Sequence, residues 1–197
     1  MKKTSEAKPV GAVLVPLAEG FEEIEAVAII DVLRRAGLAV KVAGLTGKLV
    51  TGSHGIALQG DCTLDEIDAG SLTMIVLPGG QPGTNNLERD PRVIALVREL
   101  EASGRRVGAI CAAPKVLAAA GILEGRAATS HPGVRGELRG ARVVDEPRVV
   151  RAGKVITSQG PGTALEFALA IVADLCGEAK ARELAEKMLV EAPALPR

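Results

Sequence analysis

Cys111 is the residue of this chain whose type and position point most directly to chemistry. It follows the apolar stretch 107–110, typical of a buried strand, and immediately precedes a predicted helix. Pro114 suits the first turn of that helix, because proline lacks the N–H that would be unsatisfied there. Free backbone N–H groups and the helix dipole at this place both favour a reactive thiolate. The pattern predicts a nucleophile on a sharp turn; the alternative is a small buried side chain.

Glu25 falls on the apolar face of its predicted helix, which is an unusual place for a charged residue. On a helical wheel Glu22 and Glu23 lie outside this face. An ionised carboxylate in apolar surroundings raises its pKa or finds a partner, and a partly protonated glutamate beside a thiolate can act as a general acid/base. The alternatives are a boundary side chain that bends out to solvent and an interface residue. The apolar members of the face are Phe21, Ile24, Ala28, Ile29 and Val32.

Glycines and histidines supply further candidates. Gly79 and Gly80 end an apolar stretch, and the N–H of Gly80 with those of the Cys111 turn would form an oxyanion hole; the alternative is a plain tight turn. His131 is either a base or orienting partner for Cys111 or a lone loop histidine. We expect His54 at the surface. Residues 78–83 match no nucleotide-binding motif.

The remaining cysteines indicate no metal site. Cys176 closes an apolar helix and is expected to pack there, whereas Cys62 lies in a polar connection. Two distant histidines and three scattered cysteines lack the close spacings of zinc ligands, so we predict neither metal nor cofactor. Sparse, unpaired thiols also favour a reducing compartment, and we expect a cytoplasmic protein.

Composition excludes several classes of protein. The chain has 197 residues, 47% of them hydrophobic, with 24 basic and 24 acidic side chains. It has no Trp, no Tyr and only two Phe, so neither the basic excess nor the stacking surface of a nucleic-acid binder is present. No apolar run is long enough to span a membrane. We therefore expect neither nucleic acid nor membrane as a partner.

Strands and helices alternate along the sequence. This order predicts a mainly parallel sheet covered on both faces, in one domain over 9–197 after a flexible tail at 1–8. Ligands of such sheets bind beyond the carboxyl ends of the strands, which directs attention to 18–20, 78–80, Cys111 and 158–160. Strands are predicted at 10–17, 38–45, 54–58, 72–77, 107–110, 143–145, 149–151 and 155–157, and helices at 22–36, 91–102, 112–120, 161–176 and 178–189.

Several of these segments, taken in order, resemble the ThiJ/PfpI superfamily, most closely the bacterial-type members of its parkinsonism-associated deglycase branch. The resemblance covers nearly the whole chain. Its segments are LAEGFEEIEAV at 17–27, DVLRRAG at 31–37, VLPGG at 76–80, AICAAP at 109–114, SHP at 130–132 and TSQGPGT at 157–163. It implies a flavodoxin-like three-layer sandwich of the class I glutamine amidotransferase type, and a homodimer.

The resemblance also implies roles for individual residues. Cys111 matches the oxidation-prone nucleophile of the family, Glu25 the glutamate that hydrogen-bonds it, and His131 the nearby histidine. Gly80, with the backbone of Cys111 and Ala112, matches an anion-holding pocket, and Pro161 matches a residue of the pocket wall. Where the peptidase-like branch has a histidine after its cysteine, this chain has Ala112, which disfavours peptidase activity.

The sequence is compatible with three functions. The leading hypothesis is a cofactor-independent enzyme of the glyoxalase III or protein deglycase type, acting on dicarbonyls or glycated substrates through a Cys111 hemithioacetal, with Glu25 as general acid/base. The second is an oxidative-stress sensor or redox-regulated chaperone in which Cys111 is oxidised to sulfinate. The third is a cysteine hydrolase of small substrates.

Overall fold

A parallel sheet forms the centre of the fold in the computed structural model, which describes residues 11–190. Its strands are β1 (Ala12–Leu17), β2 (Val40–Gly44), β5 (Cys62–Thr63), β6 (Leu72–Leu77), β7 (Arg106–Ile110), β10 (Val149–Ala152) and β11 (Val155–Ser158). The order across the sheet is β10-β11-β7-β6-β1-β2-β5, and only β10 and β11 pair antiparallel. Two small pairs lie outside it: antiparallel β3 (Leu49–Thr51) and β4 (Ala57–Gln59), and parallel β8 (Ala127–Ala128) and β9 (Arg142–Val143).

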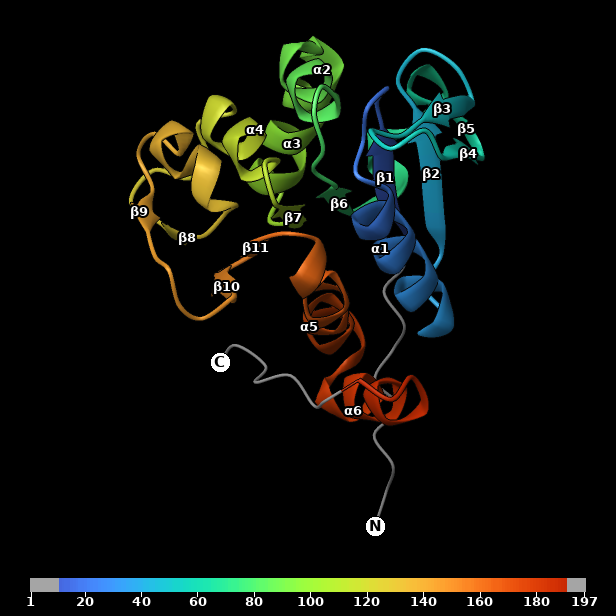
Figure 1. The fold of residues 1–197 in the computed structure, drawn as a ribbon, viewed down its shortest axis with the longest axis vertical. Coiled ribbons are helices and arrows are strands. Elements are labelled where there is room, and N and C mark those ends of the chain that lie inside the picture. Colours follow the sequence, from blue (N-terminus) through green and yellow to red (C-terminus); the bar gives the residue numbers. More distant parts are fainter. Residues whose placement is uncertain (1–10, 191–197) are drawn as a thin grey trace.

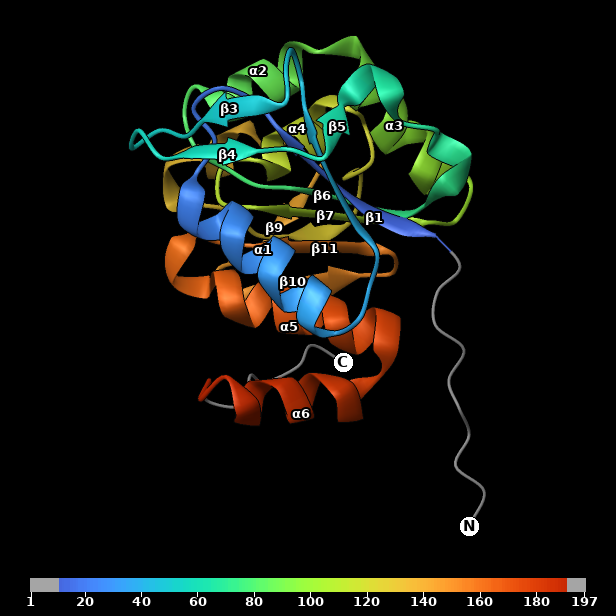
Figure 2. The same cartoon turned by 90° about the vertical axis from the view of Figure 1, so that its right-hand side faces the viewer.

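Helices cover both faces of the sheet, which confirms the predicted α/β sandwich (Figures 1 and 2). One layer holds α1 (Glu23–Arg35) and α5 (Ala164–Cys176), with α6 (Glu178–Lys187) outside α5; the other holds α2 (Gly83–Arg89), α3 (Pro91–Ala102) and α4 (Pro114–Ala119). Short 3-10 helices are η1 (Leu64–Glu66), η2 (Ala69–Ser71), η3 (Pro132–Glu137) and η4 (Pro161–Thr163). No helix between residues 11 and 190 is long and apolar enough to cross a membrane.

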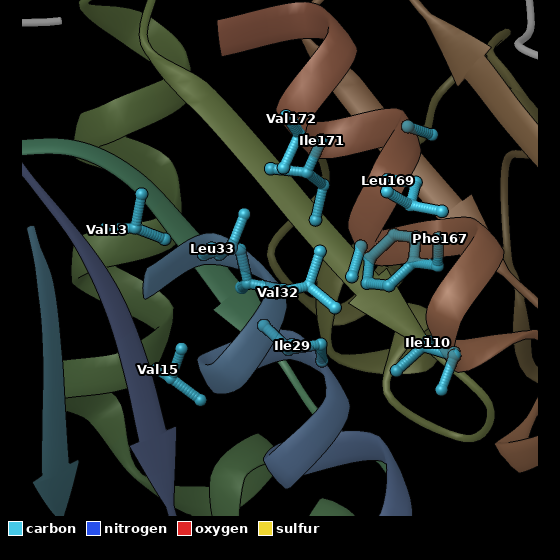
Figure 3. Packing of buried hydrophobic residues seen from close by; sticks show 14 of the residues in the cluster. Val13, Val15, Ile29, Val32, Leu33, Ile110, Phe167, Leu169, Ile171 and Val172 are labelled. Atoms are coloured by element: carbon cyan, nitrogen blue, oxygen red, sulfur yellow. The ribbon is translucent and has the colours of Figure 1, made fainter. Parts of the chain in front are cut away.

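The two faces of the sheet have separate apolar cores. Every residue of β1 is buried, as a continuous apolar run in a covered parallel sheet predicts. Val13 and Val15 belong to the core with α1 and α5, whereas Leu14 packs in the core on the side of α2, α3 and α4. Figure 3 shows the first core, in which Ile29 of α1 and Phe167 of α5 lie above the sheet. These cores hold the site-bearing loops on rigid strands.

Both ends of α1 carry helix-terminating signals, of which the sequence predicted only a helix end near Ala36. The Glu22 carboxylate caps the helix by accepting a hydrogen bond from the N–H of Glu25 at 2.6 Å. Arg34 and Arg35 lie in the last turn, where they complement the helix dipole. Gly37 follows with φ of +79°, the left-handed conformation expected of a glycine after a helix end.

Some predicted elements differ from the observed ones. Helix α2 was not expected, because GTNNLER offers few helix-favouring residues and only one strongly apolar side chain. The strand expected at 54–58 occurs as β4, after a turn held against α1. The helix expected from residue 112 begins only at Pro114, since residues 111–113 form the turn itself. The tail predicted at 1–8 lies outside the described residues.

Candidate active site

The carboxyl ends of four strands bring the predicted candidates together. The loop at 18–20 follows β1, 78–80 follows β6, Cys111 follows β7, and 159–160 follows β11. In the sheet, β6 lies between β1 and β7. After β1 the chain continues to β2 on one side, and after β6 it continues to β7 on the other side. Ligand sites of open parallel sheets lie at such a switch point. The expected functional edge is therefore the edge at which these residues gather.

Cys111 occupies a strained turn between β7 and α4. Its φ is +62°, which is rare for a residue with a side chain and costs roughly 1–3 kcal/mol. Main-chain hydrogen bonds hold it on both sides: its N–H donates to the carbonyl of Ser158 at 3.0 Å, and its carbonyl accepts from the N–H of His131 at 2.8 Å. The sharp turn predicted for a nucleophile is confirmed, and residues of two other segments maintain it.

Gly79 and Gly80 leave the space that this arrangement requires. A Cβ on Gly79 would lie 2.7 Å from the Cβ of Cys111 and 2.8 Å from Oε2 of Glu25. Gly80 has φ of +94°, and a Cβ there would lie 2.3 Å from the backbone nitrogen of Glu22. Any side chain at either position would collide with the groups that form the site.

Glu25 is completely buried and lies against the Cys111 thiol. Its Oε2 accepts a hydrogen bond from the N–H of Gly79 at 2.7 Å, whereas Oε1 has no partner with full hydrogen-bond geometry. Burial raises the pKa of Glu25 to about 7, although the hydrogen bonds from Gly79 and Cys111 act in the opposite direction. The carboxyl group is therefore partly protonated near neutral pH, as a general acid/base requires.

The Cys111 thiol has a different electrostatic setting from the one that a helix N-terminus predicts. Burial and the neighbouring Glu25 carboxylate raise its pKa to about 12, while the N–H groups of Ala112 and Gly80 lower it. The N–H groups at the turn favour thiolate as expected, but burial of the sulfur and the carboxylate in contact with it outweigh them. Two negative charges are unfavourable here, so thiolate forms when Glu25 holds the proton.

His131 reaches the site mainly through its backbone. Its side chain is exposed, and Nδ1 accepts a hydrogen bond from the N–H of Gly133 at 3.1 Å, which caps η3. Nε2 then carries the proton of the neutral ring and acts as a donor. This arrangement does not fit a base for Cys111, and it leaves open the orienting partner and the lone loop histidine that the sequence also allowed. Pro161 is exposed and starts η4, next to Gly160 and on the same edge.

The first turn of α1 contradicts the helical wheel in two ways. Glu22 and Glu23 are buried, and Ile24, which was placed on the buried face, is 61% exposed. The turn at 52–55 covers this end of the helix from another side, so one buried face does not describe it. Glu23 binds that turn, accepting from the backbone N–H of His54 at 2.7 Å and contacting its ring Nδ1 at 3.0 Å.

These contacts change the ionisation of both partners. Although burial acts to raise it, the pKa of Glu23 is lowered to about 2 by hydrogen bonds from His54 and Ile56. The carboxylate in turn raises the pKa of His54, whose ring is exposed as predicted. Among the described residues, Glu22, Glu23 and His54 place metal-ligand atoms close together. The spacing of metal-ligand residue types along the sequence does not indicate this cluster, because His54 is distant from the two glutamates in the sequence.

The other two cysteines lie outside this site. Cys176 ends α5 and packs against the α1–α5 core, which confirms the predicted packing role. Cys62 is half-buried in β5, at the edge of the sheet, and not in the polar connection that the sequence indicated. None of the three cysteines forms a disulfide within the described part of the chain.

The raised pKa of Glu25 predicts a pH-dependent cost to stability. The unfolded carboxyl titrates near 4.5 and the folded one near 7, so the folded state binds this proton more tightly. The cost is absent below the unfolded pKa and complete above the folded pKa, where it amounts to about 3 kcal/mol. Between about pH 4 and about pH 8, urea unfolding should show Glu25→Gln gaining that much stability relative to the unmodified protein.

Glu186→Gln, at an exposed position on α6, is the matched control, and its difference from the unmodified protein should stay constant with pH. A constant difference for Glu25→Gln as well would contradict the raised pKa.

Comparison with known proteins agrees with this geometry. The model of the DJ-1/PfpI family matches residues 11–174. Protein dj-1beta of Drosophila melanogaster is 43% identical over 179 residues, covering 90% of this chain and 96% of that protein. Its crystal structure superposes with a TM-score of 0.89 at 42% identity, covering 93% of this chain and 100% of the other.

A second relative carries an enzymatic name. The glutathione-independent glyoxalase DJR-1.2 of Caenorhabditis elegans is 40% identical over 174 residues, covering 87% of this chain and 91% of that protein. The family match spans the whole sandwich up to α5 and includes every residue of the candidate site. The chain belongs to the DJ-1/PfpI family.

Proposed function

We propose that this protein is a cofactor-independent enzyme that converts reactive dicarbonyls such as methylglyoxal to hydroxy acids. The observation that carries the proposal is the buried Glu25–Cys111 pair, in which a carboxyl group with a pKa of about 7 contacts a thiol on a strained turn. The pair combines a nucleophile with a group that can give and take a proton at the same place.

The first step uses the shared proton. The Cys111 thiolate adds to the aldehyde carbon and forms a C–S bond, and the C=O electron pair becomes an alkoxide. This alkoxide takes the proton of Glu25, which leaves a hemithioacetal and a carboxylate. Covalent addition also removes the negative charge from the sulfur, so the like-charge repulsion that opposed ionisation of Glu25 is lost.

The second step is an isomerisation. The Glu25 carboxylate removes the C–H proton of the hemithioacetal carbon, and the electron pair forms an enediolate whose negative charge lies on the adjacent oxygen. Glu25 returns the proton to the adjacent carbon, and the proton of the first hydroxyl passes to the adjacent oxygen as the first carbon becomes a thioester. Water hydrolyses the thioester to lactate and regenerates the thiol. One dicarbonyl and one water give one hydroxy acid, so no external oxidant or reductant is needed.

The surrounding groups support this route. The N–H groups of Gly80 and Ala112, which act on the sulfur in the free protein, are placed to stabilise the oxyanion that forms beside it. His131 offers its Nε2–H to the second oxygen of the substrate. The same attack on glycated thiols or amines would constitute deglycation. The name of the nematode relative, a glutathione-independent glyoxalase, supports the substrate class.

Lactate formation from methylglyoxal without glutathione tests the proposal. The unmodified protein should form lactate, and Cys111→Ser should form no measurable amount. The kcat of Glu25→Gln should be about 10²–10⁴-fold lower than that of the unmodified protein. Cys62→Ser and Cys176→Ser are matched controls outside the site and should retain activity. Full turnover by a folded Glu25→Gln protein would rule out the assigned acid/base, and no turnover by the unmodified protein would rule out the activity.

A second candidate function, sensing of oxidants, is favoured by the same N–H donors. They and a protonated Glu25 are placed to hold the oxygens of a sulfinate, which forms when a thiolate is oxidised by two equivalents of peroxide. After mild peroxide treatment, mass spectrometry should find two added oxygens on Cys111 and none on Cys62 or Cys176. An unmodified Cys111 would remove this function, whatever the result of the lactate assay.

We also propose a homodimer through the exposed side of α1. Ile24 and Val27 are 61% and 45% exposed on this helix, and Ile56 beside it is 57% exposed. Between Val27, Ile30 and Leu58 lies a hollow of about 210 Å³ that apolar side chains of a second copy would fill. Clustered apolar side chains of this kind mark interaction surfaces.

The reduced thiols also support the expected cytoplasmic location.

Light scattering after gel filtration tests the dimer. The unmodified protein should have twice the mass of one chain, and Val27→Arg should have the mass of one chain, because burying an unpaired guanidinium in the interface is unfavourable. Val143→Arg, at an exposed apolar residue on β9, is the matched control and should remain dimeric. A dimeric Val27→Arg protein would place the interface elsewhere.

A further inference from the structure

Lys115 is a buried cation one helical turn after Cys111. Its side chain is only 8% exposed and lies in the first turn of α4, where a positive charge opposes the helix dipole. Burying an ammonium group is unfavourable unless other groups pair with it. Nothing in the helix itself therefore explains a lysine at this position, and its partners must supply the reason.

The partners come from two other elements. Nζ donates to Oδ1 of Asn85 at 2.6 Å and to Oε2 of Glu137 at 3.2 Å, and it lies 3.3 Å from Oε2 of Glu88. Asn85 and Glu88 belong to α2, whereas Glu137 is the last residue of η3. One ammonium group thus joins α2, α4 and η3.

Each of these elements directly follows a part of the site. Helix α2 begins three residues after Gly80, and η3 begins immediately after His131. Helix α4 begins three residues after Cys111. The segments that carry Cys111, Gly80 and His131 are therefore also joined by the side chain of Lys115, a few residues beyond the site.

Apolar packing makes only part of this connection. Leu87 of α2, Val116 and Leu117 of α4 and Leu138, directly after η3, are buried in the same core. Around the ammonium group, however, a cavity of about 390 Å³ lies between the elements, lined by Lys115, Glu88, Ala118, Ala119, Gly136, Glu137 and Arg139. Side chains do not interlock across such a space, so the polar contacts of Lys115 add to the apolar ones there. The N–H of His131 holds one end of η3 to the carbonyl of Cys111, and Lys115 holds the other end through Glu137.

We propose that Lys115 is a positioning residue, which holds α2 and η3 against α4 so that the Gly80 N–H and His131 stay aligned on Cys111. It acts through position and does not touch the sulfur, since the groups that act on the thiol are Glu25, Ala112 and Gly80. Loss of its contacts weakens the attachment of η3 and α2 to α4 and removes none of the chemistry-bearing side chains.

The test measures the reactivity of Cys111, so it does not depend on the proposed dicarbonyl activity. The rate of alkylation by iodoacetamide is followed against pH in a Cys62→Ser, Cys176→Ser background. Lys115→Met keeps the length of the side chain and removes the cation. Because the pKa of Cys111 is about 12, the alkylation rate between about pH 7 and about pH 9 is proportional to the small thiolate fraction. Loss of one N–H donor raises the pKa of the thiol by about one unit, so Lys115→Met should react about tenfold more slowly at each pH. Lys154→Met, at an exposed turn lysine, should react at the unmodified rate.

Two further variants separate positioning from folding. Lys115→Arg retains the cation and should restore most of the reactivity, whereas Glu137→Gln weakens only the contact to η3 and should give a smaller decrease in rate. If Lys115→Met does not fold, Glu137→Gln carries the test alone. A folded Lys115→Met protein with a lower Tm and an unchanged alkylation rate would overturn the proposal, as would an unchanged rate in Glu137→Gln. A slower alkylation without lactate formation would support positioning and count only against the dicarbonyl activity.

Discussion

The contact between a buried carboxyl group and a thiol is the constraint on which the site depends. Glu25 and Cys111 cannot both ionise without strong repulsion in their dry surroundings. The pair therefore holds at most one negative charge, and when it holds one, the position of the remaining proton decides which residue carries it. Gly79 makes the contact possible by having no side chain, and its N–H binds the carboxyl group. The loop after β6 approaches these atoms so closely that a side chain on Gly79 or Gly80 would collide with the site.

The rest of the fold maintains this unfavourable arrangement. A left-handed cysteine and a buried acid each reduce stability, and they persist because both are attached to elements that are well packed. Helix α1, which carries Glu25, packs against α5 over β1 and β6, whereas Cys111 follows β7 in the same sheet (Figure 3). The two apolar cores thus bring together residues that are far apart in the sequence and prevent them from relaxing apart.

Local sequence predicted the parts of the site that depend on local geometry. A cysteine between an apolar strand and a proline-started helix indicated the turn, and the glycines after β6 indicated a close approach of backbone. The burial of Glu23 could not be predicted in this way, because it depends on a turn thirty residues away. Lys115 was missed for a similar reason, since its partners lie on two other elements. The ionisation of Cys111 was not predicted, because it depends first on the burial of the sulfur and then on the Glu25 carboxylate, and both follow from the packing of distant segments.

The nucleophile is held in place mainly by backbone atoms. Ser158 contributes its carbonyl oxygen to Cys111, and His131 contributes its N–H, so neither contact depends on the identity of a side chain. Exposed positions on the same edge of the sheet, such as His131 and Pro161, can therefore be exchanged during evolution while the sulfur stays where it is. A lineage with this scaffold can acquire a new substrate by a few surface replacements, without first rebuilding its reactive centre.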